Sequence, residues 1–137
     1  MAEMLELEVA TPERELVREQ VSEVQLPGKN GYMGILPGHA PLVGLLGIGT
    51  LTYMVNGQKR YMAVHEGFLE VAEDHVRVLA DLAEHKEEID IQRAKAALQR
   101  SLDMFVNPSL GVDPAVAMTS MSRAQARITT AEIRVDH

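Results

Sequence analysis

The chain has 137 residues, of which 46% are apolar and 24% are charged, and its formal net charge is −7. It contains no Cys, which excludes disulfide bonds, thiolate metal sites and cysteine catalysis. No apolar run approaches the roughly 18 residues that a membrane-spanning helix needs, and the acidic start of the chain is unlike a signal peptide. We therefore expect a soluble, intracellular protein. Without a cluster of Lys and Arg in its acidic part, it is not expected to bind nucleic acid.

Charge is unevenly distributed along the chain. Residues 1–88 carry a net charge of −8, whereas residues 89–137 carry +1. Nearly all the glycines lie in the first part, and the second part is rich in Ala, Gln, Arg and Met. This change of composition near Ile89 predicts two structural units, which we place at residues 1–86 and 87–137.

The first unit is predicted to consist of short strands. Apolar and acidic residues alternate over residues 5–9, which is typical of a strand with one solvated face. Further strands are expected over residues 21–26, 50–55, 58–64, 68–71 and 76–80. Asn56-Gly57 is a strong signal for a tight hairpin, because a type I′ turn needs positive φ at both central residues. A second hairpin turn is expected over residues 72–75. Regular short strands with Gly and Pro between them predict an antiparallel β-sandwich or a flattened barrel.

The second unit is predicted to be a hairpin of two helices. Apolar residues recur at helical spacing in two stripes, formed by Ile91, Ala94, Leu98, Leu102 and Phe105 and by Ala117, Met121, Ala124, Ile128 and Ala131. Asp90 is the expected N-cap of the first helix, Asn107-Pro108 is expected to end it, and Asp113-Pro114 to begin the second. The small residues of the second stripe indicate modest packing energy. The hairpin must therefore be stabilised by contact with the sandwich, with a ligand or with a partner.

The sequence shows no self-contained active site. The stretch from Gly28 to Gly34 lacks the Gly-Lys-Ser/Thr ending of a phosphate-binding loop, so its glycines are expected to form turns. The five histidines do not have metal-ligand spacing, and each is expected to be structural or on the surface. No serine lies in a nucleophile-elbow context. Glu84 and Asp90 could form an acid/base pair, but capping and solvation explain them as well. We predict no catalytic residues and no metal site.

The arginines of the second unit are candidates for binding an anion. They are Arg93, Arg100, Arg123, Arg127 and Arg134. The first two, seven residues apart, share one line of the first helix, and the other three lie along one side of the second. Guanidinium groups match the geometry of phosphate and carboxylate oxygens. If the hairpin brings the two rows together, they form an anion site in which Glu84 or Asp90 orients a sugar or an amine. Solvated helix faces and ion pairs with an acidic partner remain alternative interpretations.

Three motifs in order carry a resemblance to a known family. The run from Gly31 to Leu42, GYMGILPGHAPL, resembles the signature loop of the ε subunits of F-type ATP synthases. The segments 67–71 and 76–81 are similar to that family's Gly-Phe-x-x-Val strand and its Val-x-Val-Leu-Ala-Asp strand. Residues 89–94 resemble its Ile/Leu-Asp-x-x-Arg-Ala motif. The resemblance covers essentially the whole chain and implies an N-terminal β-sandwich with a C-terminal helical hairpin.

The resemblance also implies a place in a rotary motor. The family's ε subunit is a non-catalytic part of the central stalk of a proton-translocating ATP synthase. It binds the γ subunit, contacts the ring of c subunits and turns with them. Its hairpin either lies against the sandwich or extends into the α/β head, where it suppresses ATP hydrolysis. The implied location is peripheral, on the cytoplasmic side of the inner membrane, with membrane contact only through the complex.

Candidate site residues follow from the same resemblance. In some bacterial members ATP binds the compact hairpin, and the matching positions here are Glu84, Ile89, Asp90, Arg93, Ala94, Arg100, Arg123 and Arg127. Tyr32 and His39 match candidate contacts to the rotor ring. The implied ATP is a regulatory ligand, and no catalytic cofactor is implied. Two alternatives are a stand-alone nucleotide-sensing module without an ATP synthase partner and a small sandwich hydrolase, which would need an activated nucleophile or a metal.

Overall fold

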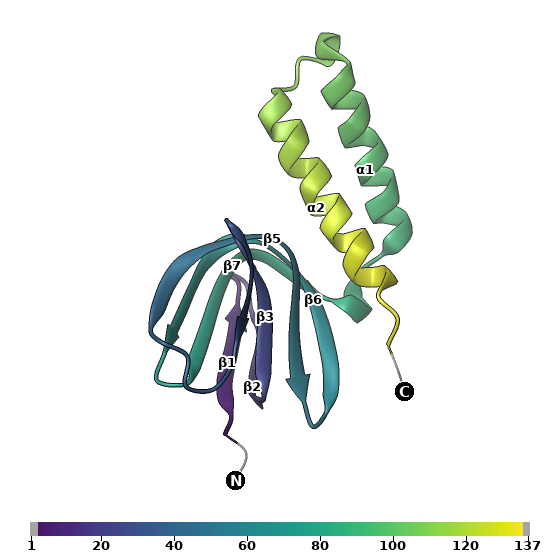
Figure 1. Ribbon diagram of the computed structural model, residues 1–137. Helices are drawn as coiled ribbons and strands as arrows, with labels where there is room; N and C mark the ends of the chain where they lie inside the picture. The colour runs from purple at the N-terminus through teal and green to yellow at the C-terminus, as the bar shows by residue number, and fades with distance from the viewer. Residues whose placement is uncertain (1–2, 136–137) are drawn as a thin grey trace.

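The computed structural model describes residues 3–135 and shows a β-sandwich followed by a two-helix hairpin (Figure 1). The strands are β1 (Leu5–Ala10), β2 (Glu15–Val21), β3 (Glu23–Gly28), β4 (Gly31–Ile35), β5 (Leu42–Val55), β6 (Gln58–Ala72) and β7 (His75–His85). They form one continuous sheet in the order β2-β1-β7-β6-β5-β3-β4, which curls so that its inner faces pack together. All neighbouring strands are antiparallel except β1 and β7, which run parallel.

The core of the sandwich is built from aliphatic side chains at alternate strand positions. In β1, Leu5, Leu7 and Val9 are fully buried, whereas the glutamates between them are half-buried. This confirms the strand predicted over residues 5–9. Leu51 and Met62 are among the other fully buried side chains. Each such side chain contributes about 1.5–3 kcal/mol by leaving water.

Both predicted hairpin turns are present. Asn56 and Gly57, between β5 and β6, have φ values of 52° and 77°, as a type I′ turn requires. Glu73 and Asp74, between β6 and β7, have φ values of 50° and 59°, so a second turn of this kind forms without glycine. The turn lies within the predicted segment 72–75, between Ala72 at the end of β6 and His75 at the start of β7. The prediction of a turn there is confirmed.

The N-terminal half contains more strand than the sequence predicts. Strand β2 was not predicted, because only Val17 and Val21 of its seven residues are buried and the rest are mostly charged or polar. The expected strand over residues 21–26 is two strands, since Val21 ends β2 and Glu23 begins β3. The prediction that the glycines from Gly28 to Gly34 form turns is wrong for most of this stretch. Only residues 29–30 form the turn, and β4 follows as an edge strand that pairs with β3.

Two strands are longer than predicted. Strand β5 begins at Leu42, eight residues before the expected start. Residues 58–64 and 68–71, expected as two strands, belong to the single strand β6, which continues through an irregularity at Glu66 and Gly67 with φ values of 58° and 136°. A Cβ atom on Gly67 would lie 2.0 Å from the carbonyl oxygen of Leu79, so only glycine fits there. Glycines in these segments weaken the sequence pattern that predicts a strand. The strands nevertheless continue through them, because β5 and β6 pair with neighbours on both sides.

The hairpin consists of α1 (Ile91–Val106) and α2 (Pro114–Glu132), with short 3₁₀ turns η1 (Lys86–Glu88) and η2 (Pro108–Leu110) before and after α1. The predicted N-caps are confirmed. The Asp90 carboxylate accepts a hydrogen bond from the Arg93 backbone N–H at 3.1 Å, and that of Asp113 accepts from the Ala115 N–H at 2.9 Å. None of the helices within residues 3–135 is long and apolar enough to cross a membrane.

The second helix connects the hairpin to the sandwich. In Figure 1, α2 lies nearer to the strands than α1, and it contacts β5, β6 and η1. The buried residues of α2 are Ala117, Ala124, Ala126, Ile128 and Thr130. The first predicted stripe is covered only in part, because Leu102 and Phe105 near the end of α1 remain about 40% exposed. The far ends of both helices project away from the sandwich (Figure 1).

Candidate functional site

A cavity of about 310 Å³ lies at the junction of the sandwich and the hairpin. Its walls come from the end of β7, from η1, from the first turns of α1 and from α2. It is lined by Glu84, Glu88, Ile89, Asp90, Arg93, Ala94, Ala97 and Arg127. Its volume lies at the lower end of the range of small-molecule sites.

Six of the eight residues matched to the ATP-binding pattern line this cavity. They are Glu84, Ile89, Asp90, Arg93, Ala94 and Arg127. The other two lie outside it. Arg100 is exposed two turns further along α1, and Arg123 approaches Glu66 of β6 at 3.6 Å. The two predicted arginine rows therefore meet at one arginine from each helix, Arg93 and Arg127. Within the chain, Arg123 and Arg127 form ion pairs with carboxylates of the sandwich, and ion pairing with an acidic partner stays a prediction.

Glu84 joins three elements at the wall of the cavity. One carboxylate oxygen accepts a hydrogen bond from Nε of Arg127 on α2, and the other lies 2.9 Å from Nε2 of His65 on β6. Burial raises the pKa of Glu84, but the hydrogen bonds from His65 and Arg127 outweigh it, so the pKa lies below its usual value. Glu84 is therefore ionised at neutral pH and holds α2 against the strands.

Glu88, the last residue of η1, is held by contacts of its own. Both of its oxygens accept hydrogen bonds from the Arg14 guanidinium, at 2.9 and 2.8 Å, and the His85 backbone N–H donates to one of them at 2.9 Å. These bonds hold the pKa of Glu88 at about 2. The segment that leads from β7 to α1 is thus tied to the loop between β1 and β2.

Arg93 is the available cation of the cavity. Its side chain is exposed and forms no ion pair with any of residues 3–135. The Asp90 carboxylate is used as the N-cap of α1. Arg93 and Arg127 together can bind an anion between the helices, with Arg127 exchanging its contact to Glu84 for a ligand oxygen.

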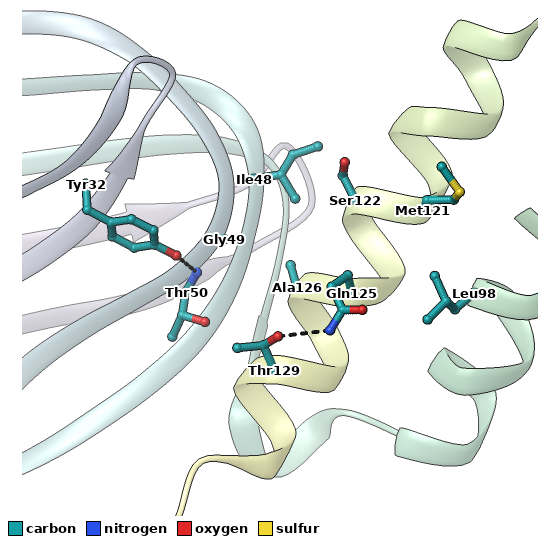
Figure 2. Close-up of a pocket in the computed structure, with 10 residues that line it drawn as sticks. All are labelled: Tyr32, Ile48, Gly49, Thr50, Leu98, Met121, Ser122, Gln125, Ala126 and Thr129. Atoms are coloured by element: carbon teal, nitrogen blue, oxygen red, sulfur yellow. Dashed lines mark hydrogen bonds between the residues drawn. The ribbon is translucent and has the colours of Figure 1, made fainter. Parts of the chain in front are cut away.

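A second cavity, of about 470 Å³, separates α2 from strands β4 and β5. Figure 2 shows Tyr32 pointing toward Thr50, with α2 on the other side of Ile48. The Thr50 N–H donates to the Tyr32 hydroxyl at 3.0 Å, and the hydroxyl oxygens of Thr50 and Thr130 lie 2.7 Å apart in the interior. The residues that line this cavity include no acid or base. The cavity lies between the sandwich and the helical hairpin, with Leu98 contributed by α1.

The two candidate ring contacts lie in β4 and in the loop that follows it. Tyr32 belongs to β4, and its ring is 58% exposed although its hydroxyl is hydrogen-bonded. His39 is half-buried in the loop between β4 and β5, with Nδ1 2.6 Å from the Ala40 carbonyl oxygen. Their contact with a rotor ring stays a prediction.

Sequence analysis missed an apolar patch on the sandwich. Leu45, Phe68 and Leu79 are direct cross-strand neighbours on β5, β6 and β7, and Val43 lies two residues from Leu45 on the same face. We call these four residues the apolar patch; all are exposed, Val43 by 76% and Phe68 by 60%. The sequence signal that could have revealed the patch is that apolar residues also occupy the strand positions between the buried ones, where polar residues are expected. A row of exposed apolar side chains on adjacent strands marks an interaction surface.

Comparison with known proteins identifies the family. Residues 4–86 match the family model described as "ATP synthase, Delta/Epsilon chain, beta-sandwich domain". A protein of Solibacter usitatus (strain Ellin6076) named ATP synthase epsilon chain is 71% identical over 96% of this chain and 98% of its own length. The chain belongs to the ATP synthase epsilon-chain family. Epsilon chains are non-catalytic subunits of the complex, so the lack of a catalytic constellation in the sequence agrees with the family.

Two further comparisons agree with this result. The ATP synthase epsilon chain of Koribacter versatilis (strain Ellin345) is 48% identical over 74% of this chain and 71% of its own length. A chain in the mitochondrial ATP synthase structure of Euglena gracilis superposes with a TM-score of 0.80, over 90% of this chain and 78% of that one. With 23% sequence identity, this second likeness shows a shared fold alone.

Proposed function

We propose that this epsilon-family chain is a central-stalk subunit of a proton-translocating ATP synthase, which links the c ring to γ and inhibits ATP hydrolysis through a mobile hairpin. The observation that supports this proposal is the cavity at the junction of hairpin and sandwich, where six of the matched ATP positions come together. A ligand there contacts α1, α2 and the sandwich at once. It therefore favours the compact hairpin over any extended one.

The hairpin is suited to movement because its interface with the sandwich is weak. Three of the five buried residues of α2 are alanines, and Ile128 is the only large apolar side chain among the five. Alanine offers little apolar area, so polar contacts carry much of the docking. These include Arg127 with Glu84, the Thr50–Thr130 hydroxyl pair, and a hydrogen bond from the Lys86 ammonium to the Ala131 carbonyl at 2.7 Å.

The proposed ligand is ATP, with its phosphates between Arg93 and Arg127. Ligand at a hundred times its dissociation constant stabilises the state that binds it by about 2.7 kcal/mol, enough to shift a weakly docked hairpin. In this proposal, Arg100 and Arg123 reach the phosphates only after their side chains reorient, because both lie outside the cavity in the present conformation. When ATP is depleted, the hairpin opens and its exposed stripe becomes available to γ and to the α/β head.

We further propose that the sandwich docks on γ through the apolar patch, and that Tyr32 and His39 face the c ring. The patch occupies the outer face of three adjacent strands, separate from the cavity. Two residues of the patch, Leu45 and Phe68, also line a cavity of about 540 Å³ together with Thr119 and Ser122 of α2, so a subunit docked on the patch lies next to the hairpin. The subunit is then peripheral on the cytoplasmic side of the inner membrane and touches the membrane only through the complex.

The ATP proposal is tested by titrating ATP into the isolated chain while recording its melting temperature and the distance between labels on α2 and the sandwich. We expect ATP to raise the melting temperature and to increase the compact fraction. Arg93→Ala should abolish the response, whereas Lys95→Ala, an exposed change on the same helix, should preserve it. No response at millimolar ATP, or an equal response in Arg93→Ala, contradicts the proposal.

The docking proposal is tested by co-purification with γ and the c ring. Phe68→Glu introduces a charge into the apolar patch and should abolish capture of γ, whereas Lys59→Glu at the β5–β6 turn should not. If the wild-type chain binds ATP but neither variant nor wild type binds γ, the stand-alone nucleotide-sensing module is the better description.

A further inference from the structure

His65 is a buried histidine to which sequence analysis assigned no function. It lies in β6, and its side chain is fully buried. Its Nε2 atom is 2.9 Å from a carboxylate oxygen of Glu84 on β7. Its Nδ1 atom is also buried and has no hydrogen-bond partner among residues 3–135. A polar side chain at this depth needs an explanation, because burying it costs free energy unless its partners are present.

The geometry indicates which nitrogen carries the proton. With the proton on Nε2, the imidazole donates to the Glu84 carboxylate and leaves only a lone pair on Nδ1 without a partner. With the proton on Nδ1, a buried N–H would have no acceptor and a lone pair would face a carboxylate oxygen. We therefore assign a hydrogen to Nε2, the nitrogen that faces the Glu84 carboxylate.

Glu84 depends on this contact for its orientation. One of its oxygens is held by His65 inside the sandwich, which leaves the other oxygen for Arg127 on α2. Other charged groups face the same cavity: Glu88, Asp90 and Arg93 line it, and Glu88 is paired with Arg14. His65, by contrast, is the donor that approaches Glu84 from the strands.

We propose that His65 is a positioning residue that holds the Glu84 carboxylate in place for Arg127 and thereby sets how firmly the hairpin docks on the sandwich. Without its donor, the partly buried carboxylate loses one of its two partners and takes up a proton more readily. The carboxylate is then free to turn away from Arg127, which weakens the ionic contact of α2 with the strands. The effect on docking stands on the present geometry; any effect on nucleotide affinity rests on the proposed function.

The first test uses the wild-type chain. Nitrogen NMR of the His65 imidazole should show a hydrogen on Nε2, the nitrogen that faces Glu84. The opposite tautomer overturns the proposal. This measurement needs no variant and therefore does not depend on how well a substitution folds.

The second test compares His65→Leu with His65→Gln, which keeps an N–H donor. We expect His65→Leu to raise the pKa of the Glu84 carboxyl, measured by carbon NMR, and to lower the ratio of docked to undocked hairpin about tenfold. His65→Gln should restore most of both. Docking is measured between labels on cysteines introduced at the exposed Ser120 and Gln58, since the chain has no cysteine of its own.

Two controls separate positioning from general stability. Val64→Ala removes buried volume from the neighbouring residue of β6 and should lower the melting temperature without changing the pKa of Glu84 or the docked ratio. In a Glu84→Gln background, His65→Leu should cause little further loss of docking. An unchanged docked ratio in His65→Leu, or equal losses with and without Glu84, overturns the proposal.

Running ATP titrations on the same variants keeps the two proposals distinct. If the wild type does not bind ATP but His65→Leu still loses docking, the nucleotide proposal fails and the positioning proposal stands. If ATP binds while docking and the pKa of Glu84 are the same in wild type and His65→Leu, the positioning proposal fails and the nucleotide proposal stands.

Discussion

The sandwich and the hairpin are stabilised by different interactions. The sandwich buries large aliphatic side chains completely, among them Leu7, Leu51 and Met62. The buried residues of α2 are mainly alanines, and polar contacts, chiefly Arg127 with Glu84, connect this helix to the sandwich. Apolar burial scales with area and does not depend on a ligand, whereas polar contacts can be exchanged for other partners. The difference teaches that apolar burial holds the sandwich together, whereas the docked position of the hairpin depends more on polar contacts.

The largest expected effect tests the sandwich core. Leu51→Ala should lower the free energy of unfolding by about 2–5 kcal/mol, because it leaves a cavity at a fully buried site. Leu102→Ala on α1, where the side chain is about 40% exposed, should lower it by less than about 1 kcal/mol. Chemical denaturation measures both. Similar losses would show that the two units do not differ in how they are held.

The next effect concerns the backbone of the sandwich. Gly67→Ala should cost about 3 kcal/mol, because its φ of 136° and the carbonyl of Leu79 leave no room for a Cβ atom. Gly34→Ala is a matched control, since a Cβ atom there meets nothing within 4 Å. Thermal unfolding should separate the two variants clearly. A tolerated Gly67→Ala would mean that the β6 irregularity can relax.

A smaller effect is expected where the hairpin docks. Arg127→Ala should weaken docking by about 2 kcal/mol, because a charge-assisted hydrogen bond to a partly buried carboxylate is lost. Amide exchange should speed up in α2 and remain unchanged in β1 and β7. Arg123→Ala removes a longer contact to Glu66 and should cost less than about 1 kcal/mol. Equal acceleration in strands and helix would contradict independent release of the hairpin.

The smallest expected effect depends on pH. The pKa of Glu88 is about 2 in the folded chain and near 4.5 when unperturbed, so its ion pair with Arg14 stabilises the fold above about pH 4.5. That contribution is lost as the pH falls from about 4.5 to 2, since the unfolded chain takes up the proton first. For a solvent-accessible pair, we expect less than about 1 kcal/mol. Unfolding free energies between pH 2 and 7 should fall less steeply for Glu88→Gln than for wild type.

Local signals in the sequence predicted the turns, the caps and much of the secondary structure. Asn56-Gly57, Asp90 and Asp113 act on backbone groups within three residues of themselves, so their roles can be inferred without the rest of the fold. The edge strands β2 and β4 were missed because few of their side chains are buried and pairing with a neighbour forms them. Their hydrogen bonds lie on the backbone, which carries no residue-specific signal.

The sequence by itself determined the two-unit composition, the core positions of β1, the helix boundaries near Asn107 and Asp113, and a set of arginines able to bind an anion. Only the tertiary structure decided which of them meet: Arg93 and Arg127 line one cavity, while Arg100 and Arg123 do not. It also decided that His65 lies beneath Glu84, and that Glu84 faces a residue 43 positions later. Turns and caps depend on neighbours along the chain, but these contacts depend on how β6 pairs with β7 and on how α2 packs against the strands.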